Sequence, residues 1–166
     1  YKGGIGTASR LVPLAGETYT VGALVQTNFS GNLNLYGKPL PGGPCKAQQD
    51  GPCMIVVAVH APVDARQLKR SAKRGIVGMC YTGSYLANGS GDFCIAFSNW
   101  EPNLFPRSGK GVHNWHILPD EQLNPLFEAT TEAVQEAVYN SLVMAEDTHG
   151  YDGLLAKALV LPEAAL

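Results

Sequence analysis

The chain has little charge and no long hydrophobic run. Only 16% of its 166 residues are charged, and 12 basic against 14 acidic side chains leave a net charge of −2. Such a balance gives no overall field that would attract nucleic acid or anionic lipid. No apolar stretch approaches the ~20 residues that a helix needs to span a bilayer. We therefore expect neither a nucleic-acid partner nor a membrane partner.

Cysteine is also scarce, and its spacing lacks the density of a small disulfide-bonded domain. The cysteines are Cys45, Cys53, Cys80 and Cys94. We expect reduced thiols. The chain shows neither an initiator Met nor a signal-peptide pattern, which indicates a fragment or a processed product. The sequons at Asn28 and Asn88 coincide with candidate site residues, where a glycan would block a pocket, so we expect an intracellular, cytoplasmic protein.

Apolar residues, by contrast, make up 45% of the chain, and 19 residues are glycine, which suits many tight turns. A chain of this length can bury one hydrophobic core, so we expect one compact domain over residues 1–166. After a glycine-rich entry, residues 18–28 and 33–36 are typical of two strands joined by a turn. Residues 37–52 are so rich in Gly and Pro that we expect an exposed, flexible loop. Residues 54–59 (MIVVAV) predict a strand buried on both faces.

The second half of the chain alternates helices with a strand. A helix should begin after Asp64, a good cap, and bury small or apolar side chains. Its predicted buried stripe is Leu68, Ala72, Gly75, Ile76, Met79 and Cys80. Residues 92–98 predict a strand, and residues 126–145 the clearest helix. Strands interleaved with helices indicate an α/β or α+β layered domain.

Cys53 lies where the loop meets the predicted buried strand. A nucleophile of the N-terminal type needs a thiol or hydroxyl, its own free α-amino group as base, and a chain break that exposes both. The thiol of Cys53 could attack the carbonyl of Pro52, giving a thioester that water hydrolyses. The competing interpretation is a small buried hydrophobe, which most isolated cysteines are. Cys45, which also follows Gly-Pro, is a rival nucleophile, but no strand follows it.

A polar glycine turn at residues 88–92 (NGSGD) leads into the strand at 92–98. It is either an ordinary turn or a support for the nucleophile. In the second case Ser90 and Asp92 would hydrogen-bond the Cys53 amine and thiol, with Asp92 holding the ammonium form. Asn28, at the end of a strand, could donate its side-chain amide to an oxyanion.

Five short strings, in order along nearly the whole chain, resemble the L-aminopeptidase/D-esterase family, which includes β-peptidyl aminopeptidases. They are residues 2–10 (KGGIGTASR), 19–29 (YTVGALVQTNF), Cys53 with its apolar strand, 67–70 (QLKR), and 88–92 (NGSGD) with 96–98 (AFS). Residues 132–146 and 150–153 are similar to the family's last helix and turn.

The resemblance implies an α+β fold of the N-terminal-nucleophile type, a four-layer αββα sandwich, and self-cleavage into two subunits. Residues 1–52 would end the larger subunit, whose front part is missing here, and residues 53–166 would form the smaller one. Cys53 takes the nucleophile's place, Ser90 and Asp92 that of the supporting pair, and Asn28 that of the oxyanion donor.

This resemblance implies an enzyme that releases N-terminal residues from peptides, amides or esters without a cofactor. Together with the low surface charge it also leads us to expect a homo-oligomer, a tetramer. The family's usual nucleophile is serine or threonine, and glycine is more familiar than Pro52 before it. Cysteine shifts the chemistry toward a thioester and toward acyl transfer.

Three other interpretations stay open. The first is a metal site at His113 and His116, or at His60, although the spacing lacks the Glu and third ligand of the familiar zinc pattern. The second is a basic helix face over residues 66–74 that binds phosphate, where a solvated face or a subunit contact is the simpler interpretation. The third is an uncleaved, noncatalytic scaffold that keeps the fold.

Overall fold

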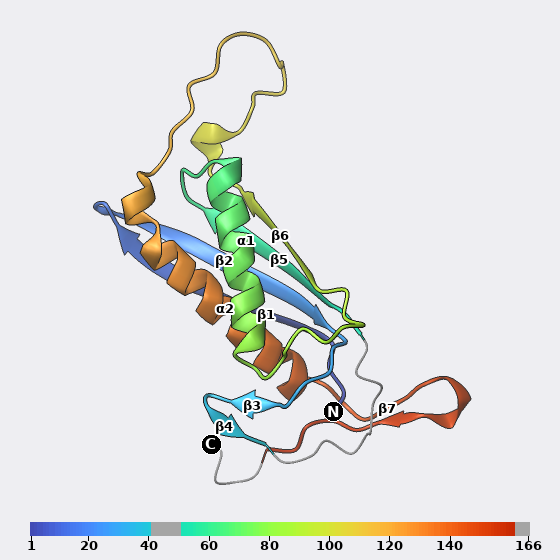
Figure 1. Ribbon diagram of the computed structural model, residues 1–166. Coiled ribbons are helices and arrows are strands. Elements are labelled where there is room, and N and C mark those ends of the chain that lie inside the picture. The colour runs from blue at the N-terminus through green and yellow to red at the C-terminus, as the bar shows by residue number, and fades with distance from the viewer. Residues whose placement is uncertain (41–50, 162–166) are drawn as a thin grey trace.

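The computed structural model describes residues 1–40 and 51–161, and residues 41–50, which include Cys45, lie outside the described part. Four strands form a sheet in the order β1-β2-β5-β6, and two helices cover one face of it (Figure 1). The strands of the sheet and the helices are β1 (Ile5–Leu14), β2 (Glu17–Thr27), β5 (Cys53–His60), β6 (Phe93–Ser98), α1 (Ala65–Cys80) and α2 (Asn124–Val143). The short pieces are β3 (Asn34–Leu35), β4 (Lys38–Pro39), β7 (Thr148–His149), β8 (Leu155–Ala156), η1 (Glu101–Asn103), η2 (Asp120–Gln122) and η3 (Tyr151–Gly153). Among the described residues, no helix is both long and apolar enough to cross a membrane.

The strand directions bring distant parts of the sequence to one edge of the sheet. β1 and β2 form a hairpin whose two turn residues, Ala15 and Gly16, both have positive φ, as a tight hairpin requires. β2 runs antiparallel to β5, whereas β6 runs parallel to it after a crossover through α1. The end of β2 and the beginnings of β5 and β6 therefore lie side by side.

The core lies between the sheet and the two helices. Side chains of a strand alternate between its faces, and in β5 every second residue is fully buried. The β5 residues on the helix side are Cys53, Ile55, Val57 and Val59. α2 places Ala133, Val134, Ala137 and Val138 against this face, and α1 adds Met79. Helix α1 begins at the predicted cap, because Asp64 and Gln67 form a reciprocal capping box.

The other face of the sheet is apolar, and none of the residues in 1–40 and 51–161 forms a layer over it. Leu24, Val56 and Ile95 are cross-strand neighbours there, and Leu24 and Ile95 are 39% and 55% exposed. A shallow groove of about 460 Å³ runs over this face, between Thr7 on β1 and Phe97 on β6. The described residues thus provide one helical layer and one sheet, which is two of the four layers expected.

The predicted strand pairing at the beginning of the chain is wrong. The glycine-rich entry forms strand β1, whose Gly6 packs so closely against the main chain of Ala137 in α2 that a Cβ would not fit. β1 takes the place beside β2 that we expected for residues 33–36. Those residues pair with β4 instead, and the main-chain N–H of Asn34 donates to Thr82. Glycines required for close packing hid the strand pattern.

Two predicted burial patterns also need correction. β5 is fully buried on the helix side only, and its other side is half-buried in the described residues. On α1, Gly75 and Met79 are buried as predicted, but Gln67, Ser71 and Gly78 complete the stripe, and Leu68 and Ile76 are only partly buried. Small residues line the contact because α2 and β6 approach α1 closely, as the close neighbours of Gly75 and Gly78 show. α2 begins two residues before its predicted start and ends two residues before its predicted end.

Candidate functional site

The residues predicted from separate motifs meet at one edge of the sheet. Asn28 follows the last residue of β2, Cys53 begins β5, and Ser90 and Asp92 belong to the turn that precedes β6. The antiparallel pairing of β2 with β5 and the parallel pairing of β5 with β6 bring these three strand ends together. The structure therefore places all four predicted catalytic residues around the Pro52–Cys53 peptide.

The Pro52–Cys53 peptide group is held on both sides. The main-chain N–H of Asn28 donates to the carbonyl oxygen of Pro52 at 3.1 Å. The main-chain N–H of Cys53 donates to Asp92 Oδ1 at 2.7 Å. The carbonyl thus points toward β2 and the N–H toward the β6 side. The contact from Asn28 comes from its main chain, whereas the sequence suggested its side-chain amide.

Ser90 connects Gly51, two residues before Cys53, to the carboxylate of Asp92. Its Oγ lies 2.8 Å from the carbonyl oxygen of Gly51 and 2.6 Å from Asp92 Oδ2. A hydroxyl carries one hydrogen, so it donates to one of these acceptors at a time or shares the hydrogen between them. Ser90 therefore bridges the peptide before the junction and the group that binds the Cys53 nitrogen.

Gly51 is the residue at the junction that the sequence analysis did not single out. Its φ of +133° is a conformation that a side chain rarely adopts, and a Cβ there would collide with the main-chain oxygen of Asn28. The signal was present in the sequence, since glycine occurs two residues before Cys53. Because the chain contains 19 glycines, a single glycine near Cys53 did not by itself indicate a special backbone conformation.

The thiol of Cys53 is buried and not activated in this intact chain. The residue has 0% exposure, and Gly51 and Pro52 beside it are only half-buried. Burial, together with the charge of Asp92 and the nearby Cys94, raises the pKa of the Cys53 thiol to about 12. This burial agrees with the competing interpretation of a small buried hydrophobe, and it arises because strand alternation turns the Cys53 side chain toward the helices with Ile55. Cys53, Cys80 and Cys94 are all free thiols.

The histidines do not gather into a metal centre. Among the described residues, no group of three or more His, Cys, Asp or Glu side chains could hold a metal ion. His60 Nδ1 lies 3.2 Å from Asn99 Oδ1, and His113 and Trp115 pack beside Phe105. These contacts are those of surface and loop packing.

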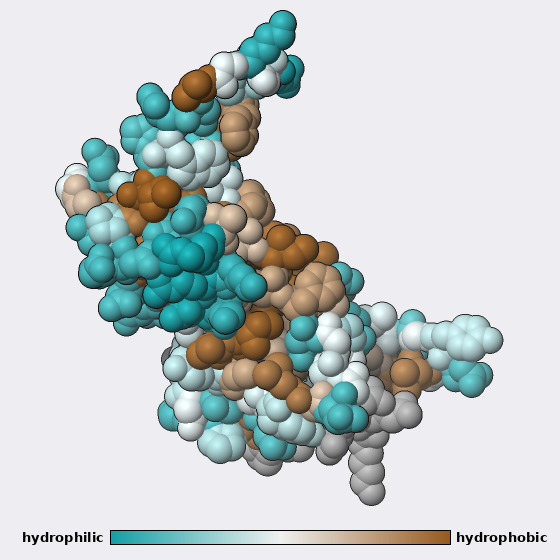
Figure 2. Space-filling view, turned by 45° about the horizontal axis from the view of Figure 1, so that its top comes forward, coloured by the Kyte–Doolittle hydropathy of each residue, from teal (hydrophilic) through white to brown (hydrophobic). Residues whose placement is uncertain are grey.

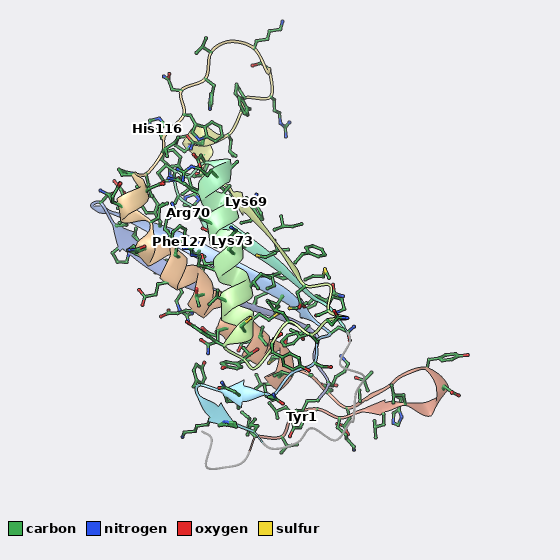
Figure 3. The ribbon with its side chains drawn as sticks, viewed as in Figure 1. Tyr1, Lys69, Arg70, Lys73, His116 and Phe127 are labelled. Carbon is green, nitrogen blue, oxygen red and sulfur yellow. The ribbon has the colours of Figure 1, made fainter. Side chains whose placement is uncertain are left out.

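The basic residues of α1 are largely engaged within the protein. Asp120 forms ion pairs with Arg66 at 2.8 Å and Arg70 at 3.1 Å, and the guanidinium of Arg74 lies over the Phe127 ring. Figure 3 labels Arg70 and Phe127 where α1 and α2 lie side by side, and Figure 2 shows hydrophilic side chains gathered in the middle of that face. These arginines connect α1 to α2 and to the segment before it, which favours a structural role over a phosphate site.

Two curated proteins are similar in sequence to this chain along its whole length. A beta-peptidyl aminopeptidase of Sphingosinicella microcystinivorans is 38% identical over all of this chain and 46% of its own length, and one of Sphingosinicella xenopeptidilytica is 35% identical with the same coverage. The chain therefore spans about half the length of these curated relatives.

Solved structures agree in fold. A protein of Pyrococcus horikoshii OT3 has 43% identity and a TM-score of 0.87, covering 99% of this chain and 46% of its own. The L-aminopeptidase D-Ala-esterase/amidase of Ochrobactrum anthropi, a prototype of the serine aminopeptidases, has 35% identity and a TM-score of 0.86, covering 96% and 46%. Its fold is a variant of the N-terminal-nucleophile hydrolase fold, and the present chain shares it. The model of peptidase family S58 matches residues 1–156, and this chain belongs to that family.

Proposed function

We propose that this protein is a self-processing aminopeptidase or amidohydrolase whose nucleophile is Cys53. The observation that carries the proposal is the hydrogen-bonded junction: Asp92 accepts from the Cys53 nitrogen at 2.7 Å, while Ser90 lies within 2.6 Å of the same carboxylate. In this proposal residues 1–52 end the larger subunit, and residues 53–166 form the smaller one.

Self-cleavage provides the free amine that catalysis needs. The Cys53 nitrogen is tied up in a peptide bond until an N-to-S acyl shift and hydrolysis release it. The released α-amino group has an ordinary pKa of about 7.7–8.0, so it can accept the thiol proton near neutral pH. Asp92 then stabilises the ammonium form, because its carboxylate already lies beside that nitrogen.

Substrate hydrolysis repeats the same chemistry on a bound amide. The Cys53 thiolate attacks the substrate carbonyl, the amine leaves, and water hydrolyses the thioester. Ser90 keeps the Asp92 carboxylate oriented, and the Asn28 side-chain amide donates to the substrate oxyanion. The curated relatives are beta-peptidyl aminopeptidases, so we propose short peptides or amides with a free amino end as substrates.

Intact mass measurement of the complete protein tests self-cleavage. We expect two polypeptides, the smaller beginning at Cys53, and a Cys53→Ala variant that remains one chain. Cys80→Ala is the matched control, since Cys80 is also a free thiol whose pKa is raised by burial, and it lies at the end of α1, outside the junction. It should cleave as the unmodified protein does. A wild type that stays one chain would refute self-processing.

Turnover is tested with the processed protein. Amino-acid amides and short peptides of α- and β-amino acids should release their N-terminal residue in the wild type and not in Cys53→Ala. An added amine acceptor distinguishes hydrolysis from acyl transfer, since the acyltransferase alternative predicts a new amide with the acceptor. Complete self-cleavage without turnover of any of these compounds would reject the proposed substrate class.

A noncatalytic scaffold is the second candidate, and one observation favours it. Cys53 is fully buried, and its thiol pKa is raised to about 12, which opposes ionisation as long as the chain stays intact. The scaffold predicts an intact chain with a persistent Pro52–Cys53 bond, so the same mass measurement separates the two functions.

The uncovered apolar sheet face supports a proposal about partners. Leu24, Val56 and Ile95 would pack against the remainder of the larger subunit, since this chain spans 46% of the curated relatives. We further propose a homotetramer of the complete protein in the cytoplasm, without a cofactor. Sedimentation as a stable monomer would contradict the tetramer.

A further inference from the structure

The Pro52–Cys53 peptide lies within the hydrogen-bond ladder of the sheet. Thr27 pairs with Cys53 in the β2–β5 register, so Asn28 is opposite Pro52, one position further along. At that position the Asn28 N–H donates to the Pro52 oxygen. Proline has no N–H to donate in return. A single hydrogen bond therefore joins Asn28 to Pro52, and its acceptor is the carbonyl that the Cys53 thiol would attack in self-cleavage.

The Asn28 N–H is fixed in place by the preceding residue. Thr27 donates its main-chain N–H to the Gly4 oxygen at 2.8 Å, and its Oγ1 accepts from the Gly4 N–H at 3.0 Å. The same Oγ1 lies 2.9 Å from Ser141 Oγ in α2. The end of β2 is thus tied to the N-terminal segment and to a buried helix. A donor held this rigidly does not need to reorganise when charge develops on its acceptor.

The thiol lies on the side from which attack is possible. In a strand the peptide groups lie near the plane of the sheet, and side chains stand roughly perpendicular to it. Cys53 shares the helix side with Ile55. Its sulfur therefore stands off the plane that contains the Pro52 carbonyl, and a nucleophile approaches a carbonyl from outside its plane.

We propose that the main-chain N–H of Asn28 is the oxyanion donor of self-cleavage, distinct from the Asn28 side chain that serves substrate turnover. This inference rests on the proposed function. One residue thereby serves two reactions: its main chain contacts the carbonyl of the protein's own Pro52, and its side-chain amide would serve a bound substrate after the break.

The acyl shift of self-cleavage needs no co-reactant, and the hydrolysis that follows needs only water. The Cys53 sulfur forms a bond to the Pro52 carbonyl carbon, and the carbonyl electron pair moves to the oxygen, where the Asn28 N–H stabilises the negative charge. When this intermediate collapses, the carbon–nitrogen bond breaks, and the nitrogen gains the proton lost by the thiol. Water then adds its hydroxyl to the carbon and returns a proton to the sulfur, leaving a Pro52 carboxylic acid, which gives its proton to solvent, and a free Cys53 amine.

The experiment compares side-chain and main-chain changes at Asn28 in the complete protein. Asn28→Ala and Asn28→Asp keep the N–H and remove the amide donor. We expect both to cleave within about threefold of the wild-type rate while losing turnover of an amino-acid amide about 10²–10³-fold, the usual effect of losing one oxyanion donor. Asn28→Pro removes the N–H, and we expect cleavage to slow by a similar factor.

Mass spectrometry over time gives the cleavage rates, and circular dichroism checks that each variant is folded. If Asn28→Pro does not fold, an ester in place of the 27–28 peptide bond removes the same N–H and keeps the side chain. The inference would be overturned if folded Asn28→Ala or Asn28→Asp failed to cleave. It would also be overturned if a protein without the Asn28 N–H cleaved at the wild-type rate. In both cases the proposed function would stand. A wild type that never cleaves would instead overturn the proposed function.

Discussion

At the scale of single residues, burial strongly changes the ionisation of two thiols, Cys53 and Cys94. Burial raises the pKa of Cys94 from 9.0 to about 12, and the pKa of Cys53 rises to the same value with added effects of Asp92 and Cys94. Cys80 also has a raised pKa because of burial. Cys53 and Cys94 are thus held neutral in the folded, intact chain over the range in which an exposed thiol would ionise.

This difference predicts how stability depends on pH. Below pH 9 a thiol is protonated in both states and contributes no slope. Between about pH 9 and 12 the unfolded chain loses the proton that the folded chain keeps, so the free energy of unfolding falls as pH rises. Cys94→Ala should flatten this fall between pH 9 and 10.5, measured as the shift of the urea midpoint. An equally steep fall in the variant would show that Cys94 ionises normally when folded.

At the scale of elements, the contact between α1 and α2 depends on glycine. A Cβ at Gly78 would collide with the main-chain oxygen of Thr131 on α2, whereas a Cβ at Gly75 would meet the sulfur of Cys94 at 2.8 Å. A main-chain atom of a packed helix cannot move away cheaply, but a cysteine side chain can rotate. The two glycines therefore look equivalent in the sequence and differ in the structure.

Alanine substitution should separate them. Both changes gain up to about 1 kcal/mol of helix propensity. For Gly78→Ala we expect a net loss of about 1–3 kcal/mol, because overpacking forces the helices apart. Gly75→Ala is the matched control and should stay within about 1 kcal/mol of the wild type. Urea denaturation of both variants gives the comparison, and equal midpoints would contradict the close approach at Gly78.

At the scale of the whole molecule, the main question is what covers the outer face of the sheet. One face is buried by two helices, and the other exposes a cross-strand apolar row of Leu24, Val56 and Ile95. The chain spans 46% of its curated relatives. We therefore expect this row to be interior in the complete protein.

A charged residue on that face tests the expectation. In the complete protein, Ile95→Asp should lower the free energy of unfolding by about 2 kcal/mol or more, because a carboxylate would be buried without a partner. Val77→Asp on α1 is the control, since Val77 is 42% exposed and Ile95 55% exposed in the described chain. The control should change stability by about 0.5 kcal/mol or less, as surface substitutions do. Equal effects of the two changes would mean that the sheet face is open.

The elements around the site were largely predictable because their signals are local. The apolar run after Cys53, the cap at Asp64 and the polar turn before β6 were each read from a few neighbouring residues, and the structure confirms the elements. The pairing of β1 with β2 was missed, since glycines and Pro13 obscured its alternation. Whether Cys53 is buried was left open by the sequence, because burial depends on which face of β5 the helices cover.

The sequence by itself determined the chemistry available to this protein: a cysteine at the head of an apolar strand, a serine and a carboxylate in a glycine turn, and no charge pattern for nucleic acid or lipid. Only the tertiary structure decided that Asn28 meets the Pro52 carbonyl through its main chain, and that Asp92 accepts from the Cys53 nitrogen. The reason is physical. Residue types are fixed by the chain, but contacts between residues 24 or 39 positions apart arise from strand register and direction, which no local pattern specifies.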